Sequence, residues 1–214
     1  MNKFKANSID VFYQPNHNGG GMDFGQDYIQ LISNRYEKSF DKVYEFCSGP
    51  GFIGFSLLGA GLAKNIVLSD IYEPVAEVIN KTIEVNGLEG RVNFYNISGV
   101  NPLPVTNIDL VVSNPPHFLS TQDWLGHIEN RIYIDENWEI HREFYSNIGE
   151  KLSDDGVVLF QENALGSSVN DFEEMISDGG LEITDVFPMK NTVGNDQIYY
   201  IESKKSIGAF SVDS

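Results

Sequence analysis

A glycine-rich turn between two apolar runs constrains the fold of this chain more than any other feature. Residues 43–46 are predicted to form a buried strand, and residues 52–62 the start of a helix. Between them, Gly49, Gly51 and Gly54 have the spacing G-x-G-x-x-G. Glycines at this spacing let the backbone turn tightly and approach a ligand closely. The pattern therefore predicts a nucleotide-type cofactor site between the first strand and the first helix of a βαβ unit.

Two acidic residues indicate which cofactor the turn would hold. Asp70 follows the next predicted strand, residues 65–69, about twenty residues after the glycines, where a carboxylate can bind ribose hydroxyls. The glycines and Asp70 alone leave open NAD, another adenosine cofactor or a tight turn without a ligand. Glu45 lies four residues before Gly49, where its charge would repel a pyrophosphate. The same charge would attract the ammonium group of S-adenosylmethionine, which we predict as the cofactor.

A second motif, Asn114-Pro115-Pro116-His117, follows a strand-like run at residues 108–113. Prolines donate no N–H and fix φ, so this turn cannot continue a sheet. It holds the Asn114 side-chain oxygen and the Pro115 carbonyl as two acceptors, which together can receive both N–H bonds of a substrate –NH₂ group. The nitrogen lone pair would then be free to attack an electrophile, which predicts methylation of an amino or amide nitrogen. The alternative for Asn114 is an Asx-turn that bonds only its own backbone.

In this order and spacing, the motifs resemble those of class I S-adenosylmethionine-dependent methyltransferases, in the Asn-Pro-Pro-Tyr group that methylates amino nitrogens. The group includes release-factor glutamine methyltransferases and enzymes that act on exocyclic amines of nucleic acids, and the resemblance covers residues 40–203. It implies that the cofactor contacts Glu45, Cys47, Gly49, Gly51, Asp70, Ile71, Asn96 and Asn114. For catalysis it implies Asn114, Pro115 and His117, and for acceptor binding Pro116, His117, Phe118 and Trp124.

The chain departs from the family pattern at two positions. Cys47 stands where the family usually has its first glycine, and we expect this small side chain to fit there. His117 stands where the family usually has an aromatic residue, so His117 or the neighbouring Phe118 is expected to pack on the planar group of the acceptor. If neither does so, the chain would be a catalytically silent module that binds the cofactor.

The remaining pattern predicts an α/β fold, a single Rossmann-like class I methyltransferase domain. We expect a seven-stranded, mostly parallel sheet with an antiparallel C-terminal hairpin strand and helices on both faces. Further helices are expected at 24–38, 73–86, 136–152 and 172–177, and further strands at 92–97, 157–161, 181–187 and 197–203. In the helix at 136–152, His141 lies on a stripe with Phe144, Tyr145 and Ile148, so it is expected to be a hydrogen-bonded core residue and not a catalyst.

The chain is also expected to divide into segments with different roles. Residues 1–40 are expected to cover the cofactor site, residues 41–205 to form the methyltransferase domain and residues 206–214 to form a loose tail. Residues 118–136 are read either as an acceptor-binding loop or as an aromatic flap packed on the sheet.

Composition narrows the partners. The formal net charge is −17, with 14 basic and 31 acidic residues, whereas nucleic-acid binders normally carry a basic face. A protein or small-molecule amine is therefore the expected acceptor, and RNA or DNA is the alternative if a local basic patch exists. The four histidines lack zinc-site spacing, so no metal is expected. A lone cysteine, no membrane-length apolar run and no signal peptide predict a cytoplasmic protein, and the oligomeric state is left open.

Overall fold

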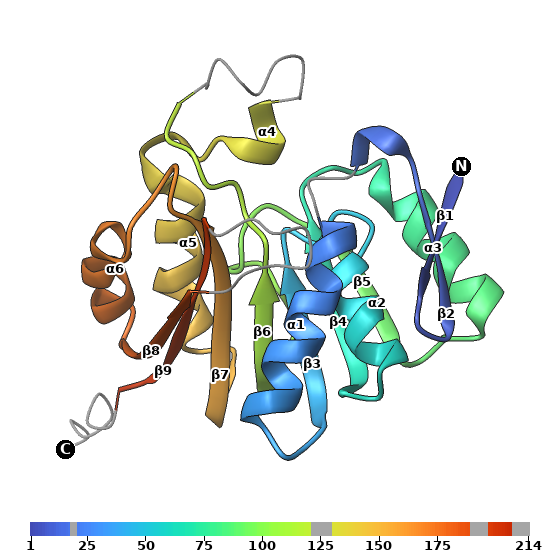
Figure 1. The fold of residues 1–214 in the computed structure, drawn as a ribbon, viewed down its shortest axis with the longest axis horizontal. Coiled ribbons are helices and arrows are strands. Elements are labelled where there is room, and N and C mark those ends of the chain that lie inside the picture. Colours follow the sequence, from blue (N-terminus) through green and yellow to red (C-terminus); the bar gives the residue numbers. More distant parts are fainter. Residues whose placement is uncertain (18–20, 121–129, 189–196, 207–214) are drawn as a thin grey trace.

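The computed structural model describes residues 1–17, 21–120, 130–188 and 197–206, and its centre is a seven-stranded sheet with the order β5-β4-β3-β6-β7-β9-β8 (Figure 1). The strands are β3 (Phe40–Phe46), β4 (Ala63–Asp70), β5 (Val92–Asn96), β6 (Ile108–Ser113), β7 (Leu152–Asn163), β8 (Leu181–Pro188) and β9 (Ile198–Lys205). The helices are α1 (Gly21–Arg35), α2 (Phe52–Gly59), α3 (Val75–Asn86), α4 (Asn130–Tyr133), α5 (Glu139–Ile148) and α6 (Glu173–Asp178). Short 3₁₀ turns are η1 (Pro15–His17), η3 (Glu136–Trp138) and η4 (Val169–Asp171).

Five neighbouring strands of this sheet run parallel to one another, and of the last two strands only β9 runs in the opposite direction. β3 pairs in parallel with β4 and β6, β4 with β5, and β6 with β7. β9 inserts antiparallel between β7 and β8. The predicted mostly parallel sheet with an antiparallel C-terminal hairpin is therefore confirmed.

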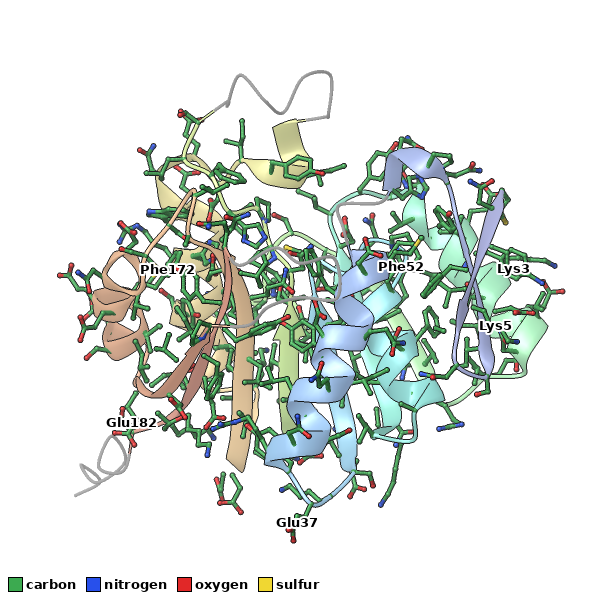
Figure 2. All side chains as sticks on the ribbon, in the orientation of Figure 1. Lys3, Lys5, Glu37, Phe52, Phe172 and Glu182 are labelled. Atoms are coloured by element: carbon green, nitrogen blue, oxygen red, sulfur yellow. The ribbon has the colours of Figure 1, made fainter. Side chains whose placement is uncertain are left out.

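The sheet separates two apolar layers, because successive side chains of a strand point to opposite faces. In β3, Val43 belongs to the layer that packs on α1, α2 and α3, and Tyr44 belongs to the layer that packs on α5 and α6. Phe52 and Phe172, which are almost fully buried, lie in these two layers on opposite sides of the sheet (Figure 2). The charged side chains labelled in the same figure lie at the periphery: Lys3, Lys5, Glu37 and Glu182.

Helix α1 is hydrogen-bonded to strands that come much later in the chain, β6, β7 and β9. The Tyr28 hydroxyl donates to the Leu159 carbonyl at 2.9 Å and also contacts the Ser113 carbonyl at 2.7 Å. At the end of the helix, Arg35 and the Tyr36 hydroxyl both donate to the Glu202 carboxylate of β9. These bonds hold residues that are more than eighty positions apart in sequence.

An N-terminal hairpin of β1 (Asn2–Ala6) and β2 (Ile9–Tyr13) was not predicted from the sequence. It lies against α3 (Figure 1), where Thr82 accepts from the Phe12 amide and Asn86 bonds both the amide and the carbonyl of Asp10. These side chains bond the backbone N–H and C=O groups on the outer edge of β2, which explains how so short a hairpin is held against α3.

The predicted helix at 136–152 is wrong at both ends. Asn137 and Trp138 have φ of 55° and 57°, so the chain kinks and α5 begins only at Glu139. At the other end, Leu152 already begins β7, which is longer than the predicted strand at 157–161. The predicted core stripe is confirmed, since His141, Phe144, Tyr145 and Ile148 are all buried.

Among the described residues, no helix is long and apolar enough to span a membrane.

Candidate functional site

A cavity of about 380 Å³ opens at the carboxyl ends of β3, β4, β5 and β6. In open parallel sheets this edge is where ligands bind, because the loops between strands and helices gather there. The loop after β3, the end of β4, the loop after β5 and the turn after β6 all line it. Asn16 and His17 of the N-terminal segment and three residues of α5, Glu139, Ile140 and Glu143, complete the wall.

The glycine loop after β3 is held in left-handed backbone conformations. Cys47, Gly49 and Gly51 have φ of 53°, 49° and 82°. A Cβ atom at Gly51 would lie 2.8 Å from the side chain of Leu68, so only glycine fits there without displacement. Cys47 also lines the cavity, and burial and nearby carboxylates raise the pKa of its thiol, so it stays protonated.

Glu45, at the end of β3, is buried beneath this loop and lines the cavity. Its carboxylate accepts from the amides of Ile53 at 3.3 Å and Gly54 at 2.7 Å, in the first turn of α2. Burial raises the pKa of Glu45 to about 8, and the two amide bonds only partly oppose this rise. The charge expected from the sequence is therefore only partly present at neutral pH in the ligand-free protein.

Asp70, at the end of β4, fixes the glycine loop. One carboxylate oxygen accepts from the Gly49 amide at 2.7 Å and the other from the Tyr72 amide at 2.8 Å. The adjacent Ile71 also lines the cavity and is 69% exposed, which leaves a large apolar side chain for a flat ligand group. Asn96 does not line the cavity; its side chain donates to the backbone carbonyls of Asp70 and Ile71.

The chemistry of this wall fits a cationic cofactor better than a phosphate. Four acidic residues line the cavity, Glu45, Asp70, Glu139 and Glu143, and the Gly49 amide, which could cradle a phosphate, already donates to Asp70. An anionic pyrophosphate would meet these groups unfavourably, whereas a ligand with an ammonium and a sulfonium would not. Within the described part of the chain, no three His, Cys, Asp or Glu side chains are grouped to hold a metal ion.

The Asn-Pro-Pro-His turn follows β6, next to β3 in the sheet. Asn114 and Pro116 line the same cavity as the glycine loop, whereas Pro115 and His117 do not. The backbone amides of His117 and Phe118 both donate to the Tyr133 carbonyl, so the chain returns to this turn after α4.

Phe118 does not lie where it was predicted. Its ring is 1% exposed and is not part of the cavity wall, so it cannot pack on an acceptor in the cavity. A Cβ atom at Gly166 would meet this ring at 2.4 Å, which shows how closely the loop after β7 covers it. His117 is 7% exposed and is also turned to the interior. Trp124 and His127 lie outside the described residues, so the alternatives for residues 118–136 remain.

A buried polar network lies behind the turn. His117 Nε2 donates to the Asn114 side-chain oxygen at 2.8 Å, and its Nδ1 lies 3.4 Å from Glu162. The other Glu162 oxygen lies 2.9 Å from His141, whose second ring nitrogen bonds Asp135 at 2.6 Å. Burial would lower the pKa of His141, but Glu162 and Asp135 outweigh it and raise the value to about 9. His141 is thus a hydrogen-bonded core residue, as predicted, and carries a charge.

Sequence reasoning missed most of this network and the α5 wall. Glu139 and Glu143 are four residues apart, so they share one helix face, opposite the predicted core stripe. That spacing was the available signal for the wall. Nothing in the sequence indicated that Glu162, at the end of a strand, would meet His117 and His141.

Comparisons with known proteins agree with this geometry. The family model described as methyltransferase small domain matches residues 18–132. The ribosomal protein uL3 glutamine methyltransferase of Francisella tularensis is 26% identical over 180 residues, which are 74% of this chain and 56% of that protein. The release factor glutamine methyltransferase of Leptospira interrogans is 36% identical over 77 residues, 35% of this chain and 27% of that protein. This chain thus spans about half of the first relative's length and about a quarter of the second's.

Two solved structures share the fold. The ribosomal protein L11 methylase of Lactobacillus delbrueckii has a TM-score of 0.59 at 17% identity, covering 83% of this chain and 76% of that one. An S-adenosylmethionine-dependent methyltransferase of Clostridium acetobutylicum has a TM-score of 0.58 at 13% identity, covering 86% and 91%. The predicted Rossmann-like fold is confirmed by these structures.

Proposed function

The chain belongs to the methyltransferase small domain family, and on that premise we propose that it methylates the side-chain amide nitrogen of a glutamine in a protein acceptor. The membership confirms the predicted family, that of S-adenosylmethionine-dependent methyltransferases. The two curated relatives are named as glutamine methyltransferases of a ribosomal protein and of a release factor, which favours glutamine over a small amine.

One observation carries the proposal: Asn114 and Pro116 line the same cavity as Glu45, Gly49 and Asp70. The acceptor motif and the cofactor motif therefore meet in a single space. Transfer needs the target nitrogen, the methyl carbon and the sulfur in line, so a shared cavity is the geometric requirement.

In the proposed reaction, bound S-adenosylmethionine supplies a methyl group on a sulfonium: the nitrogen–carbon bond forms, the sulfur–carbon bond breaks, and the nitrogen gives one proton to water. The protein contributes position. Asn114 Oδ1 would accept one N–H bond of the amide at the cavity wall. The Pro115 carbonyl, which does not line the cavity in the free protein, would turn toward it to accept the other, and the two bonds together would draw the lone pair out of conjugation. Glu45 and Asp70 would hold the amino-acid and ribose ends of the cofactor, and Ile71 would pack against its adenine.

Cofactor binding can be tested separately from the acceptor. In isothermal titration, S-adenosylmethionine and S-adenosylhomocysteine should bind at one site per chain, and NAD should give no heat. Binding of NAD without a response to either sulfur compound would overturn the cofactor assignment.

The acceptor can be sought with tritiated S-adenosylmethionine and pools of protein, RNA and small amines, followed by mass spectrometry of the labelled residue. The proposal expects N-methylglutamine in protein. Label in RNA alone or in a small amine alone would reject the protein acceptor, and no label in any pool would favour a silent cofactor-binding module.

Asn114→Ala gives the sharpest test of the mechanism. An interaction that strengthens as the nitrogen rehybridises stabilises the transition state, so its loss should lower turnover by about 10²-fold or more. Cofactor affinity should stay near the wild-type value. Asn163→Ala is the matched control, because Asn163 ends the neighbouring strand β7 and does not line the cavity. Wild-type turnover in Asn114→Ala would contradict the mechanism.

A further inference from the structure

The acceptor oxygen that the proposed reaction needs is already occupied in the free protein. Asn114 Oδ1 accepts from His117 Nε2 at 2.8 Å and from Gln161 Nε2 at 2.9 Å. A carbonyl oxygen has two lone pairs, so two donors saturate it. A target N–H can therefore reach this oxygen only by replacing one of them.

Gln161 is held firmly in place. It lies near the C-terminal end of β7 with no exposed surface, and its own oxygen accepts from the Tyr200 hydroxyl at 3.0 Å. Moving its amide would break two hydrogen bonds in a buried layer, each of which is costly to leave unmade. Gln161 therefore orients Asn114 whether or not an acceptor is bound.

His117 is the more weakly held donor. Among the described residues, its ring has one polar contact besides Asn114, a distance of 3.4 Å to Glu162, which is long for a hydrogen bond to a carboxylate. Its backbone amide is fixed by the Tyr133 carbonyl, so a change in this residue would be confined to the side chain. An amide oxygen only accepts hydrogen bonds, so His117 Nε2 must carry a proton. It is therefore an N–H donor that competes with the acceptor for Asn114 Oδ1.

We propose that His117 is a specificity-determining residue: it competes with the acceptor for Asn114 Oδ1 and so selects a primary amide, whose two N–H bonds can replace it. This inference rests on the proposed function. After one transfer the product has a single N–H, which cannot serve both Asn114 and the Pro115 carbonyl. His117 then returns to Asn114, which favours release of the monomethylated product.

Steady-state kinetics with a synthetic peptide that contains one glutamine test this competition. His117→Phe keeps an aromatic ring and removes the N–H, so KM for the peptide should fall by about 3–10-fold, the range expected for one hydrogen bond, while kcat changes little. His117→Gln keeps a donor of similar reach and should retain a KM near wild type. A KM for His117→Phe that is unchanged or raised would overturn the proposal.

Ser167→Ala is the control for the network as a whole. The Ser167 hydroxyl lies 3.4 Å from Glu162, 3.3 Å from the Asn163 carbonyl and 3.0 Å from the Tyr199 hydroxyl. Its removal therefore perturbs the surroundings of the same carboxylate without releasing the acceptor oxygen. Its KM should match that of the wild type. If Ser167→Ala lowered KM as His117→Phe does, the effect would belong to Glu162 and the proposal would fail.

Nitrogen NMR of the histidine rings tests the internal donor without any acceptor. In ¹⁵N-histidine-labelled protein at pH 7, His117 Nε2 should be protonated, with slow proton exchange that is lost in Asn114→Ala. An unprotonated Nε2 would overturn the inference. If no glutamine peptide is methylated but this signature is present, the proposed function fails while the internal donor stands.

Discussion

Cys47 shows how one side chain can oppose its own backbone conformation. Its φ of 53° lies in the left-handed region, which costs an L-residue about 1–2 kcal/mol. The glycine that the family usually has at this position has no such cost. Cysteine in place of glycine therefore strains the backbone here, which the sequence alone does not show.

The strain predicts an unusual order of variants. Cys47→Gly and Cys47→Ala both remove the sulfur, and the glycine variant should have the larger free energy of unfolding by about 1 kcal/mol, measured by urea denaturation. The same pair at Lys81, on helix α3, should show the opposite order by a similar amount. An alanine variant at Cys47 that is the more stable of the two would show that the loop carries no strain.

Glu45 predicts a pH-dependent affinity for the cofactor. With a pKa of about 8, the carboxyl is mostly protonated at pH 6, and its ionised fraction rises about tenfold per pH unit up to pH 7. If the carboxylate binds the ammonium of S-adenosylmethionine, the association constant should rise by up to about tenfold between pH 6 and 7, measured by titration calorimetry. Glu45→Gln should remove this dependence. If the association constant changed equally with pH in the wild type and in Glu45→Gln, the ammonium would bind elsewhere than at Glu45.

At the scale of elements, a charged histidine connects helix α5 to strand β7. His141 lies between Asp135, just before the η3 turn, and Glu162, near the end of β7. The aromatic rings of Trp138, Phe160 and Phe172 surround it, so water does not screen the interaction. Removing one partner of such a buried pair leaves an uncompensated charge.

Two outcomes are expected from this bridge. Glu162→Gln should lower the free energy of unfolding by about 3 kcal/mol at pH 7. In the wild type, the folded pKa of His141 is raised to about 9, so the bridge stabilises fully below pH 6.5 and its contribution is lost as the pH rises through 9. Denaturation at pH 7 and pH 9.5 measures this loss, and His141→Gln should show a smaller one. If the wild type lost no more free energy of unfolding between pH 7 and pH 9.5 than His141→Gln does, His141 would be neutral in the folded protein.

The elements also show what a sequence can and cannot predict here. The glycine loop and the Asn-Pro-Pro turn are local, since residues close in the chain define both, and both were predicted. The β1–β2 hairpin was missed because its edge is satisfied by Thr82 and Asn86, some seventy residues later. The kink at Asn137 and Trp138, which delays the start of α5 to Glu139, was also missed, because hydrophobic periodicity carries no sign of it.

The same distinction applies to the site. Glu45, Cys47, Gly49, Asp70, Ile71, Asn114 and Pro116 were predicted and line the cavity. The contribution of α5 and the meeting of His117 with Glu162 depend on how distant elements pack, so only the fold reveals them. Their roles in binding and catalysis stay predictions for the variants described above.

For the whole molecule, the net charge of −17 predicts which acceptors associate fastest. Long-range attraction should favour a basic acceptor and weaken as salt screens it. With two peptides that carry one glutamine each, kcat/KM for the lysine-rich peptide should fall as NaCl rises, and kcat/KM for the glutamate-rich peptide should rise.

Duplex DNA and bulk RNA should not bind at physiological salt. Tight, salt-sensitive binding of either would point to a nucleic-acid acceptor.

The bonds from α1 to the far strands have a consequence for how the chain is made. Tyr28 reaches Leu159 across 131 positions, and Arg35 reaches Glu202 across 167. During synthesis, the first helix therefore leaves the ribosome long before the strands that hold it exist. Until β9 emerges, β7 presents an open edge in a sheet of slow, non-local pairings, a state that invites aggregation. The hydrogen bonds of α1 can therefore all form only after β9 has been translated.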